Sequence, residues 1–115
     1  MPAPDDALPE VNAGEAIALV ANGTVLVDVR EQYEWDLGHA PDARLLPMSE
    51  IEQRIAEVPA DSRFLVACLV GGRSARVTAF LRGQGFDAVN VAGGMLAWNA
   101  AGGDLESEGP DAPRV

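Results

Sequence analysis

Cys68 is the residue whose type and surroundings best suit covalent chemistry in this sequence. It is the only cysteine among 115 residues, and it lies between an apolar run and a glycine-containing turn that opens a helix pattern. At such a strand-to-helix turn, several backbone N–H groups and the positive end of a helix dipole lie near the sulfur. These groups lower the pKa of a thiol and make it a nucleophile. The alternative reading is that Cys68 is a small buried hydrophobic residue.

The turn after Cys68 is interpreted as an anion-binding loop. Gly71 and Gly72 allow the tight curvature that points successive backbone amides inward, toward a thiolate. Arg73 either lowers the pKa of Cys68 or binds an anionic substrate, unless it only forms a salt bridge at the start of the helix. Ser74 begins that helix and is expected to support the loop. The loop residues predicted to bind substrate are Leu69, Val70, Gly71, Gly72 and Arg73.

The charge distribution also distinguishes the region around this loop. The chain has a net charge of −10, and all eight basic residues are arginine. Four arginines lie within residues 62–86, where there is no carboxylate. This stretch is consistent with an anionic ligand, although a solvated helix face is the plainer explanation. Because a strongly acidic chain is repelled by other polyanions, we expect no nucleic acid and no membrane surface as partner.

Apolar strand patterns alternate with helix patterns along most of the chain, and these elements must position the loop. Asn12 is a suitable N-cap for the first helix, which Asn22 and Gly23 end. Ser49 is expected to cap a later helix, with Glu52 as its capping-box partner. We expect helices over residues 13–21, 30–37, 49–57, 74–82 and 94–100, and strands over residues 10–11, 24–29, 43–46, 63–67 and 88–91.

This alternation predicts an α/β fold: a single domain with a central parallel five-stranded sheet and helices on both faces. Ligands of such sheets bind at the carboxyl ends of the strands, where the strand order switches. Asp28 and Cys68 each follow an apolar run, so we expect both at that edge. Asp28 and Arg30 are predicted to order the edge through an ion pair that could include Glu34. The alternative is that they only cap the ends of elements.

Length and composition set the remaining expectations. We expect a flexible N-terminal tail over residues 1–8, the domain over residues 9–103 and a flexible acidic tail over residues 104–115. One cysteine excludes an internal disulfide, and no pattern indicates a metal ion or a cofactor. No apolar run could span a bilayer and the N-terminus is acidic, so a cytoplasmic location is expected. His39, the only histidine, is expected to pin a loop rather than to act in catalysis.

With these elements in place, the chain resembles the single-domain rhodanese family of thiosulfate-type sulfurtransferases. Four blocks in the family's order carry the resemblance, and together they span about residues 11–103. The chain departs from the family pattern in two places. Asp42 replaces a common glycine, and apolar Leu69 and Val70 follow the cysteine where many thiosulfate-using members have a basic residue. The blocks are Val27-Asp28-Val29-Arg30-Glu31, Glu34 with Gly38-His39, the loop from Cys68 to Ser74, and Val91-Ala92-Gly93-Gly94 with Ala97-Trp98.

The resemblance implies transfer of a sulfane sulfur through a persulfide on Cys68. The donor would be thiosulfate or another small sulfur-containing anion or persulfide. The acceptor would be a thiol, cyanide or a sulfur-acceptor protein. Such a reaction needs a nucleophile that is already a thiolate and needs no general base, which agrees with the single histidine of this chain.

Two other classes of function remain open from the sequence. Four residues separate Cys68 from Arg73, one fewer than in the loop with which cysteine phosphatases hold a phosphate. A phosphatase or an arsenate reductase is therefore a weaker alternative, since the smaller ring of amides better suits a single sulfur atom. The other alternative is a non-enzymatic module of the same family that senses sulfur species or binds a partner.

Overall fold

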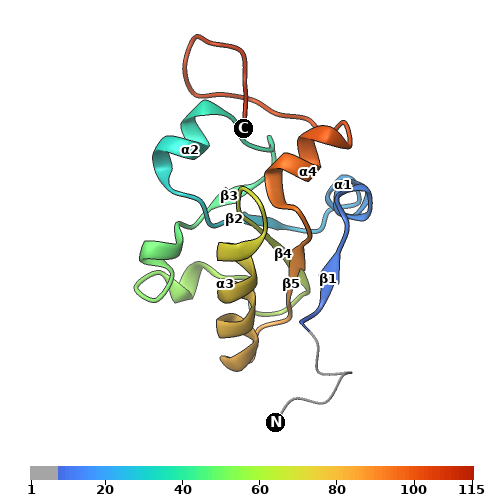
Figure 1. Ribbon diagram of the computed structural model, residues 1–115. Coiled ribbons are helices and arrows are strands. Elements are labelled where there is room, and N and C mark those ends of the chain that lie inside the picture. The colour runs from blue at the N-terminus through green and yellow to red at the C-terminus, as the bar shows by residue number, and fades with distance from the viewer. Residues whose placement is uncertain (1–7) are drawn as a thin grey trace.

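A parallel sheet of five strands forms the centre of the computed structural model, which describes residues 8–115. The strands lie in the order β1-β5-β4-β2-β3 (Figure 1). Their bounds are β1 (Glu10–Val11), β2 (Leu26–Asp28), β3 (Arg44–Leu45), β4 (Phe64–Ala67) and β5 (Ala88–Val91). The predicted fold class is confirmed. Residues 1–7, which make up most of the expected N-terminal tail, lie outside the described residues.

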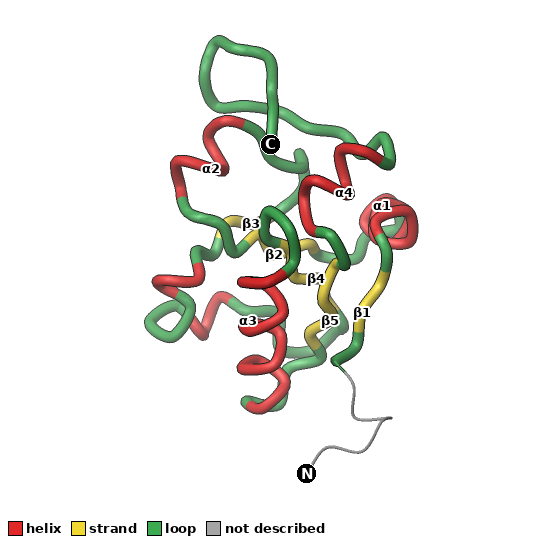
Figure 2. Tube along the Cα trace, in the orientation of Figure 1, coloured by secondary structure: helices red, strands yellow, loops and turns green. Residues whose placement is uncertain are grey.

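Helices cover both faces of this sheet (Figure 2). Helices α1 (Ala13–Ala21) and α4 (Gly94–Ala100) cover one face, and α3 (Gly72–Gly83) covers the other. The short helix α2 (Gln32–Leu37) buries none of its residues. It lies beyond the carboxyl ends of the strands, at the same end of the molecule as the loop before α3 (Figure 1). No helix in the described part of the chain is long and apolar enough to cross a membrane.

Side chains alternate between the two faces along the central strand β4. Phe64 and Val66 pack with the residues under α3, whereas Leu65 and Ala67 pack with those under α1 and α4. All four side chains are fully buried. A parallel strand covered on both faces must be apolar at every position, which is why its sequence shows no polar alternation.

Local signals in the sequence correctly predict the first helix. Helix α1 begins after Asn12, whose side chain accepts a hydrogen bond from the backbone N–H of Glu15 at 2.8 Å. The Glu15 carboxylate in turn accepts from the N–H of Asn12 at 3.1 Å. This reciprocal capping box satisfies two N–H groups that the helix itself leaves without partners.

The helix predicted over residues 49–57 is wrong. Two 3₁₀ turns, η2 (Met48–Glu50) and η3 (Ile55–Glu57), replace it. The Ser49 hydroxyl donates to the carboxylate of Glu31 at 2.9 Å instead of capping its own helix. Ile51 is buried against the apolar cluster under α3. A helix this short gains little from its own hydrogen bonds, so these tertiary contacts decide its conformation.

Residues 104–115 also differ from the flexible tail expected from their composition. Glu106 forms an antiparallel bridge with His39, through backbone hydrogen bonds of 2.9 and 2.8 Å. Leu105 and Val115 pack against the core cluster under α1 and α4. Further along the segment, the N–H groups of Glu108 and Arg114 donate to the carbonyls of Asp36 and Leu37. These apolar and backbone contacts hold the segment along α2, despite its many acidic residues, glycines and prolines.

Candidate active site

Cys68 follows the last residue of β4, next to the end of β2. Ala67 is the register partner of Asp28 in the parallel pair formed by β2 and β4. The chain order reverses between these two strands, since β3 lies outside β2 while β5 lies on the other side of β4. Such a switch point leaves a crevice at the carboxyl edge of a parallel sheet. The fold therefore brings Asp28 and the cysteine loop together, as expected from the sequence.

Hydrogen-bond donors surround the sulfur of Cys68, which is fully buried. The backbone N–H of Gly71 donates to Sγ at 3.1 Å, and the hydroxyl of Ser74 lies 3.3 Å from the same atom. Burial alone raises the pKa of the Cys68 thiol. The Ser74 hydroxyl and the backbone N–H groups of Ser74, Gly71 and Val70 outweigh burial, so this pKa lies below its ordinary value. The loop is thus built to hold a thiolate.

Helix α4 fixes the loop from the side opposite α3. The N–H of Met95 donates to the carbonyl of Cys68 at 2.8 Å, and the N–H of Leu96 donates to that of Leu69 at 3.0 Å. Gly94 allows this approach, because it has a φ of +57° and any Cβ there would overlap the carbonyl of Cys68. Gly94 belongs to the fourth block of the family resemblance, but the sequence pattern does not show what this glycine does. Its role is visible only when α4 and the loop are in contact.

Arg73 forms a salt bridge, which the sequence left open as the alternative to substrate binding, and its partner is Glu34. Its guanidinium donates to both carboxylate oxygens of Glu34 on α2, at 2.6 and 2.8 Å. This contact lowers the pKa of Glu34 and raises that of Arg73. Among the described residues, Glu34 makes no hydrogen bond to Asp28 or Arg30, although the charge of Arg30 also helps to lower the pKa of Glu34. Glu34 therefore neutralises the charge of Arg73 beside the loop. This arrangement fits the salt-bridge alternative better than direct binding of a substrate by Arg73.

Asp28 and Arg30 form a buried ion pair beneath the loop. The guanidinium of Arg30 donates to Asp28 at 3.0 Å from Nε and at 2.7 Å from Nη2. Nη2 also donates to the carbonyl of Gly38 at 2.8 Å. Neither side chain of the pair is more than 1% exposed. Arg30 therefore links the end of β2 to the residue that follows α2. These contacts support the prediction that Asp28 and Arg30 order this edge of the sheet.

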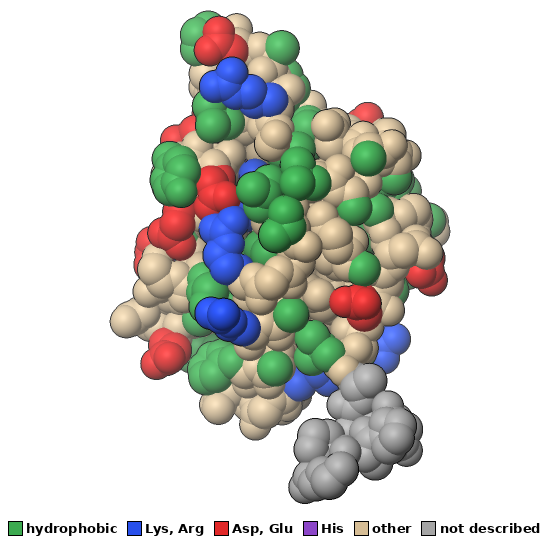
Figure 3. Space-filling model, in the orientation of Figure 1, with side chains coloured by type: hydrophobic (Ala, Val, Ile, Leu, Met, Phe, Trp, Pro, Cys, Tyr) green, Lys and Arg blue, Asp and Glu red, His purple; other side chains and the backbone are tan. Residues whose placement is uncertain are grey.

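A pocket of about 190 Å³ opens beside the loop. It mixes charged residues with apolar ones, and the C-terminal segment supplies part of its wall. Figure 3 shows hydrophobic side chains gathered over the loop before α3, beside arginine and acidic side chains. Val70 at the loop tip is 60% exposed. The residues that line the pocket are Arg30, Glu34, Leu37, Leu69, Arg114 and Val115.

The Ser74 hydroxyl offers a direct test of how the loop stabilises a thiolate. A thiol ionises as the pH rises through its pKa, and a hydrogen bond to the charged form lowers that pKa. Ser74→Ala removes one such bond, so the pKa of Cys68 is expected to rise. The ultraviolet absorbance step of the thiolate should then move to higher pH. Ser107→Ala, in the C-terminal segment, should leave the step unchanged, and an unshifted step in Ser74→Ala would contradict the assigned role.

Comparisons with known proteins agree with this geometry. A family model described as Rhodanese-like domain matches residues 12–101. The chain is 38% identical over 96 residues to the thiosulfate sulfurtransferase GlpE of Pseudomonas savastanoi pv. phaseolicola, with 83% of this chain and 91% of that protein covered. It is 41% identical over 76 residues to the probable adenylyltransferase/sulfurtransferase MoeZ of Mycobacterium tuberculosis. That match covers 64% of this chain but spans only 19% of the longer protein.

Solved structures show the same fold. The crystal structure of a rhodanese-like domain protein from Staphylococcus aureus matches with a TM-score of 0.78 and 32% sequence identity. The match covers 87% of this chain and 100% of that chain. The described fold therefore extends over nearly the whole chain.

Proposed function

Because the chain belongs to the rhodanese-like domain family, we propose that it is a sulfurtransferase that moves sulfane sulfur through a persulfide on Cys68. The observation that carries this proposal is the set of donors around Sγ, namely the N–H of Gly71 and the hydroxyl of Ser74. Together with the lowered pKa of Cys68, they favour a nucleophile that is ionised before the substrate arrives. The sulfurtransferase names of the matched relatives agree with this reading.

The first half-reaction forms the persulfide. The Cys68 thiolate attacks the outer sulfur of the donor, and an Sγ–S bond forms as the S–S bond of the donor breaks. The electron pair of the broken bond leaves with the rest of the donor, which is sulfite when the donor is thiosulfate. With thiosulfate as the donor, the outer sulfur keeps the negative charge that it already carries, so the persulfide forms as an anion. Inward-pointing N–H groups stabilise this charge as they stabilise other anions.

The second half-reaction returns the thiolate. A nucleophilic acceptor attacks the outer sulfur, and the electron pair of the Sγ–S bond returns to Sγ. Cyanide would give thiocyanate, and a thiolate would give a new persulfide. Neither half-reaction needs an outside oxidant, a metal or a proton donor. The chain's own contribution is to hold the charge on sulfur and to position the loop, which is a form of covalent catalysis.

The donor proposed here is a small sulfur-containing anion or a persulfide, with thiosulfate as one member of that class. Leu69 and Val70 place no cation next to Cys68, and Glu34 neutralises Arg73. The loop therefore relies on backbone amides rather than on a positive side chain. A thiol, cyanide or a sulfur-acceptor protein is the proposed acceptor. A reducing cytoplasm is the proposed location, because it keeps a catalytic thiol reduced.

Mass spectrometry tests the proposed persulfide. Incubation of the wild-type protein with thiosulfate, or with an organic persulfide, is expected to add the mass of one sulfur atom to the peptide that contains Cys68. Addition of cyanide should remove that mass and release thiocyanate. Hydrolysis of a phosphate ester, combined with no mass gain from any donor, would instead establish phosphatase chemistry. Lack of both activities would leave a non-enzymatic module as the function and overturn the proposal.

A further inference from the structure

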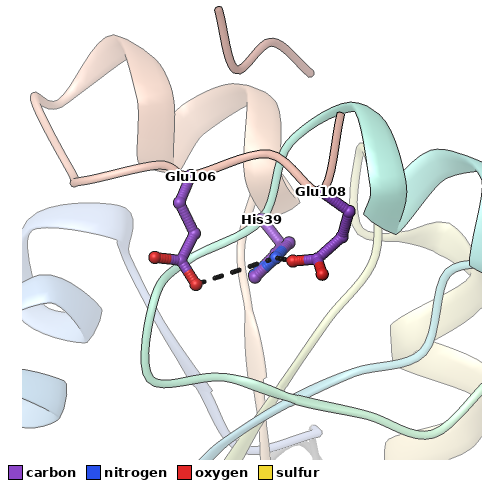
Figure 4. A group of neighbouring side chains, drawn as sticks. All are labelled: His39, Glu106 and Glu108. Atoms are coloured by element: carbon purple, nitrogen blue, oxygen red, sulfur yellow. Dashed lines mark hydrogen bonds and ion pairs between the residues drawn. The ribbon is translucent and has the colours of Figure 1, made fainter. Parts of the chain in front are cut away.

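Three potential metal ligands meet where the C-terminal segment crosses the end of α2. The antiparallel bridge places Glu106 opposite His39. Glu108 follows two residues later, and alternate residues of an extended chain point to the same side. Figure 4 shows both carboxylates reaching from this segment toward the imidazole of His39. Their oxygens lie 3.9 Å (Glu106) and 2.7 Å (Glu108) from Nε2 of His39.

Both nitrogens of the His39 imidazole face oxygen atoms that accept hydrogen bonds. The Nδ1 atom of His39 lies 3.0 Å from the carbonyl oxygen of Ala40, which can only accept a hydrogen bond. In the tautomer that donates from Nδ1 to this carbonyl, a neutral ring presents a lone pair at Nε2. That lone pair faces the carboxylate of Glu108, which is also an acceptor. Two acceptors at this distance need a proton or a metal ion between them.

The ring is held in place as a metal-binding histidine usually is. His39 is only 2% exposed, and its ring stacks on Trp35 with centroids 3.7 Å apart and planes 4° apart. A backbone carbonyl at the second ring nitrogen fixes the tautomer and orients the other nitrogen toward a metal. These contacts with Ala40 and Trp35 do not involve the two carboxylates.

The distances from Nε2 of His39 to the two carboxylates also fit a small cation. In a tetrahedral zinc site with ligands at about 2.0–2.2 Å, neighbouring ligand atoms lie about 3.4 Å apart. The observed separations of 2.7 and 3.9 Å from Nε2 lie on either side of that value. Both glutamate side chains are about half exposed, at 53% and 52%, so small rotations can correct both distances. Among residues 8–115, neither carboxylate pairs with an arginine.

We propose that His39, Glu106 and Glu108 bind a divalent transition-metal ion of the zinc type, with water completing its coordination. Imidazole nitrogen favours such a metal over calcium or magnesium, and two carboxylates balance its charge. The site goes beyond sulfur transfer, because it does not include Cys68. The metal fastens the C-terminal segment to the domain. That segment also supplies Arg114 and Val115 to the pocket beside Leu69, so the ion stabilises one wall of the pocket.

Zinc titration in a background without the thiol tests this site. Cys68→Ser protein, freed of metal by a chelator, is titrated with Zn²⁺ in a calorimeter, and Co²⁺ absorbance then reports the coordination. One equivalent of Zn²⁺ is expected to bind and to raise the melting temperature. Glu108→Gln in the same background is expected to weaken binding at least about tenfold, since even residues that only orient ligands have effects of that size. His39→Gln should do the same.

The variants are chosen to separate metal binding from folding and from sulfur transfer. Replacement of buried His39 can disturb the fold, so the half-exposed Glu108 carries the test. Glu52→Gln is the matched control, because Glu52 is an exposed glutamate that is not one of the three proposed ligands. This variant should bind Zn²⁺ normally. If the Cys68→Ser protein binds no Zn²⁺, or if Glu108→Gln binds it as tightly as that parent protein, the metal-site proposal is wrong. A protonated His39 would then be the cation that pairs with Glu108. Since Cys68 is absent, failure of the proposed sulfur transfer cannot produce either result.

Discussion

Replacing Cys68 by serine is expected to abolish sulfur transfer from thiosulfate or an organic persulfide to cyanide. A serine hydroxyl stays protonated near neutral pH and forms no persulfide, so both half-reactions lose their covalent intermediate. Removal of a catalytic nucleophile typically lowers kcat by several orders of magnitude, and a loss on the order of 10⁴-fold or more is expected here. The measurement is the rate of thiocyanate formation, with the mass of the Cys68 peptide as a second readout.

The fold of the Cys68→Ser variant should remain intact. Serine is close to cysteine in size, and its oxygen can accept the hydrogen bond that the N–H of Gly71 donates to Sγ. Circular dichroism and the melting temperature should therefore resemble those of the wild type. Thiocyanate formation at an undiminished rate in a folded Cys68→Ser protein would show that another group transfers the sulfur.

Replacing Asp28 by asparagine is expected to cause the largest loss of stability among single substitutions near the site. Asp28 balances the charge of Arg30, and both side chains are almost fully buried. Removing one partner of such a pair leaves a buried charge without compensation, which costs about 3–5 kcal/mol. Urea denaturation should therefore show a much lower midpoint for Asp28→Asn than for the wild type.

Two variants control for this effect. Glu57→Gln removes one partner of the exposed ion pair between Arg54 and Glu57, and its midpoint should barely change, because solvent already screens that pair. Combining Asp28→Asn with Arg30→Met should recover part of the loss, since the buried charge is then gone. An unchanged midpoint for Asp28→Asn would mean that water or another group compensates the charge of Arg30.

The position of the cysteine loop and the elements on either side of it follow from local sequence. Cys68 lies between a strand that is apolar at every position and a turn with two glycines, so strand, turn and helix each have their own signal. Asn12 and Glu15 form a capping box within four residues. Such interactions depend on residues close together in the chain, which is why pattern and propensity predict them.

Contacts between distant residues could not be predicted in this way. Arg73 pairs with Glu34, which lies on α2. The sequence left open whether Glu34 joins the pair of Asp28 and Arg30, because a local pattern does not show which arginine a carboxylate will meet. Residues 49–57 carry a valid helix-start signal, yet Ser49 donates to Glu31 instead. In each case a tertiary partner outweighs a weak local preference.

The sequence by itself determined a parallel α/β domain with its one cysteine at the carboxyl edge of the sheet. The signals in the sequence are the pattern of apolar residues along each element and the residue types at turns and helix ends. Both involve residues that are close together in the chain. Only the tertiary structure decided that Arg73 pairs with Glu34 and where residues 104–115 lie. His39 and Glu108 are 69 residues apart in the chain, and no periodicity links them. Their meeting depends on Leu105 and Val115 packing against the core, a gain in burial that exists only once the domain has formed.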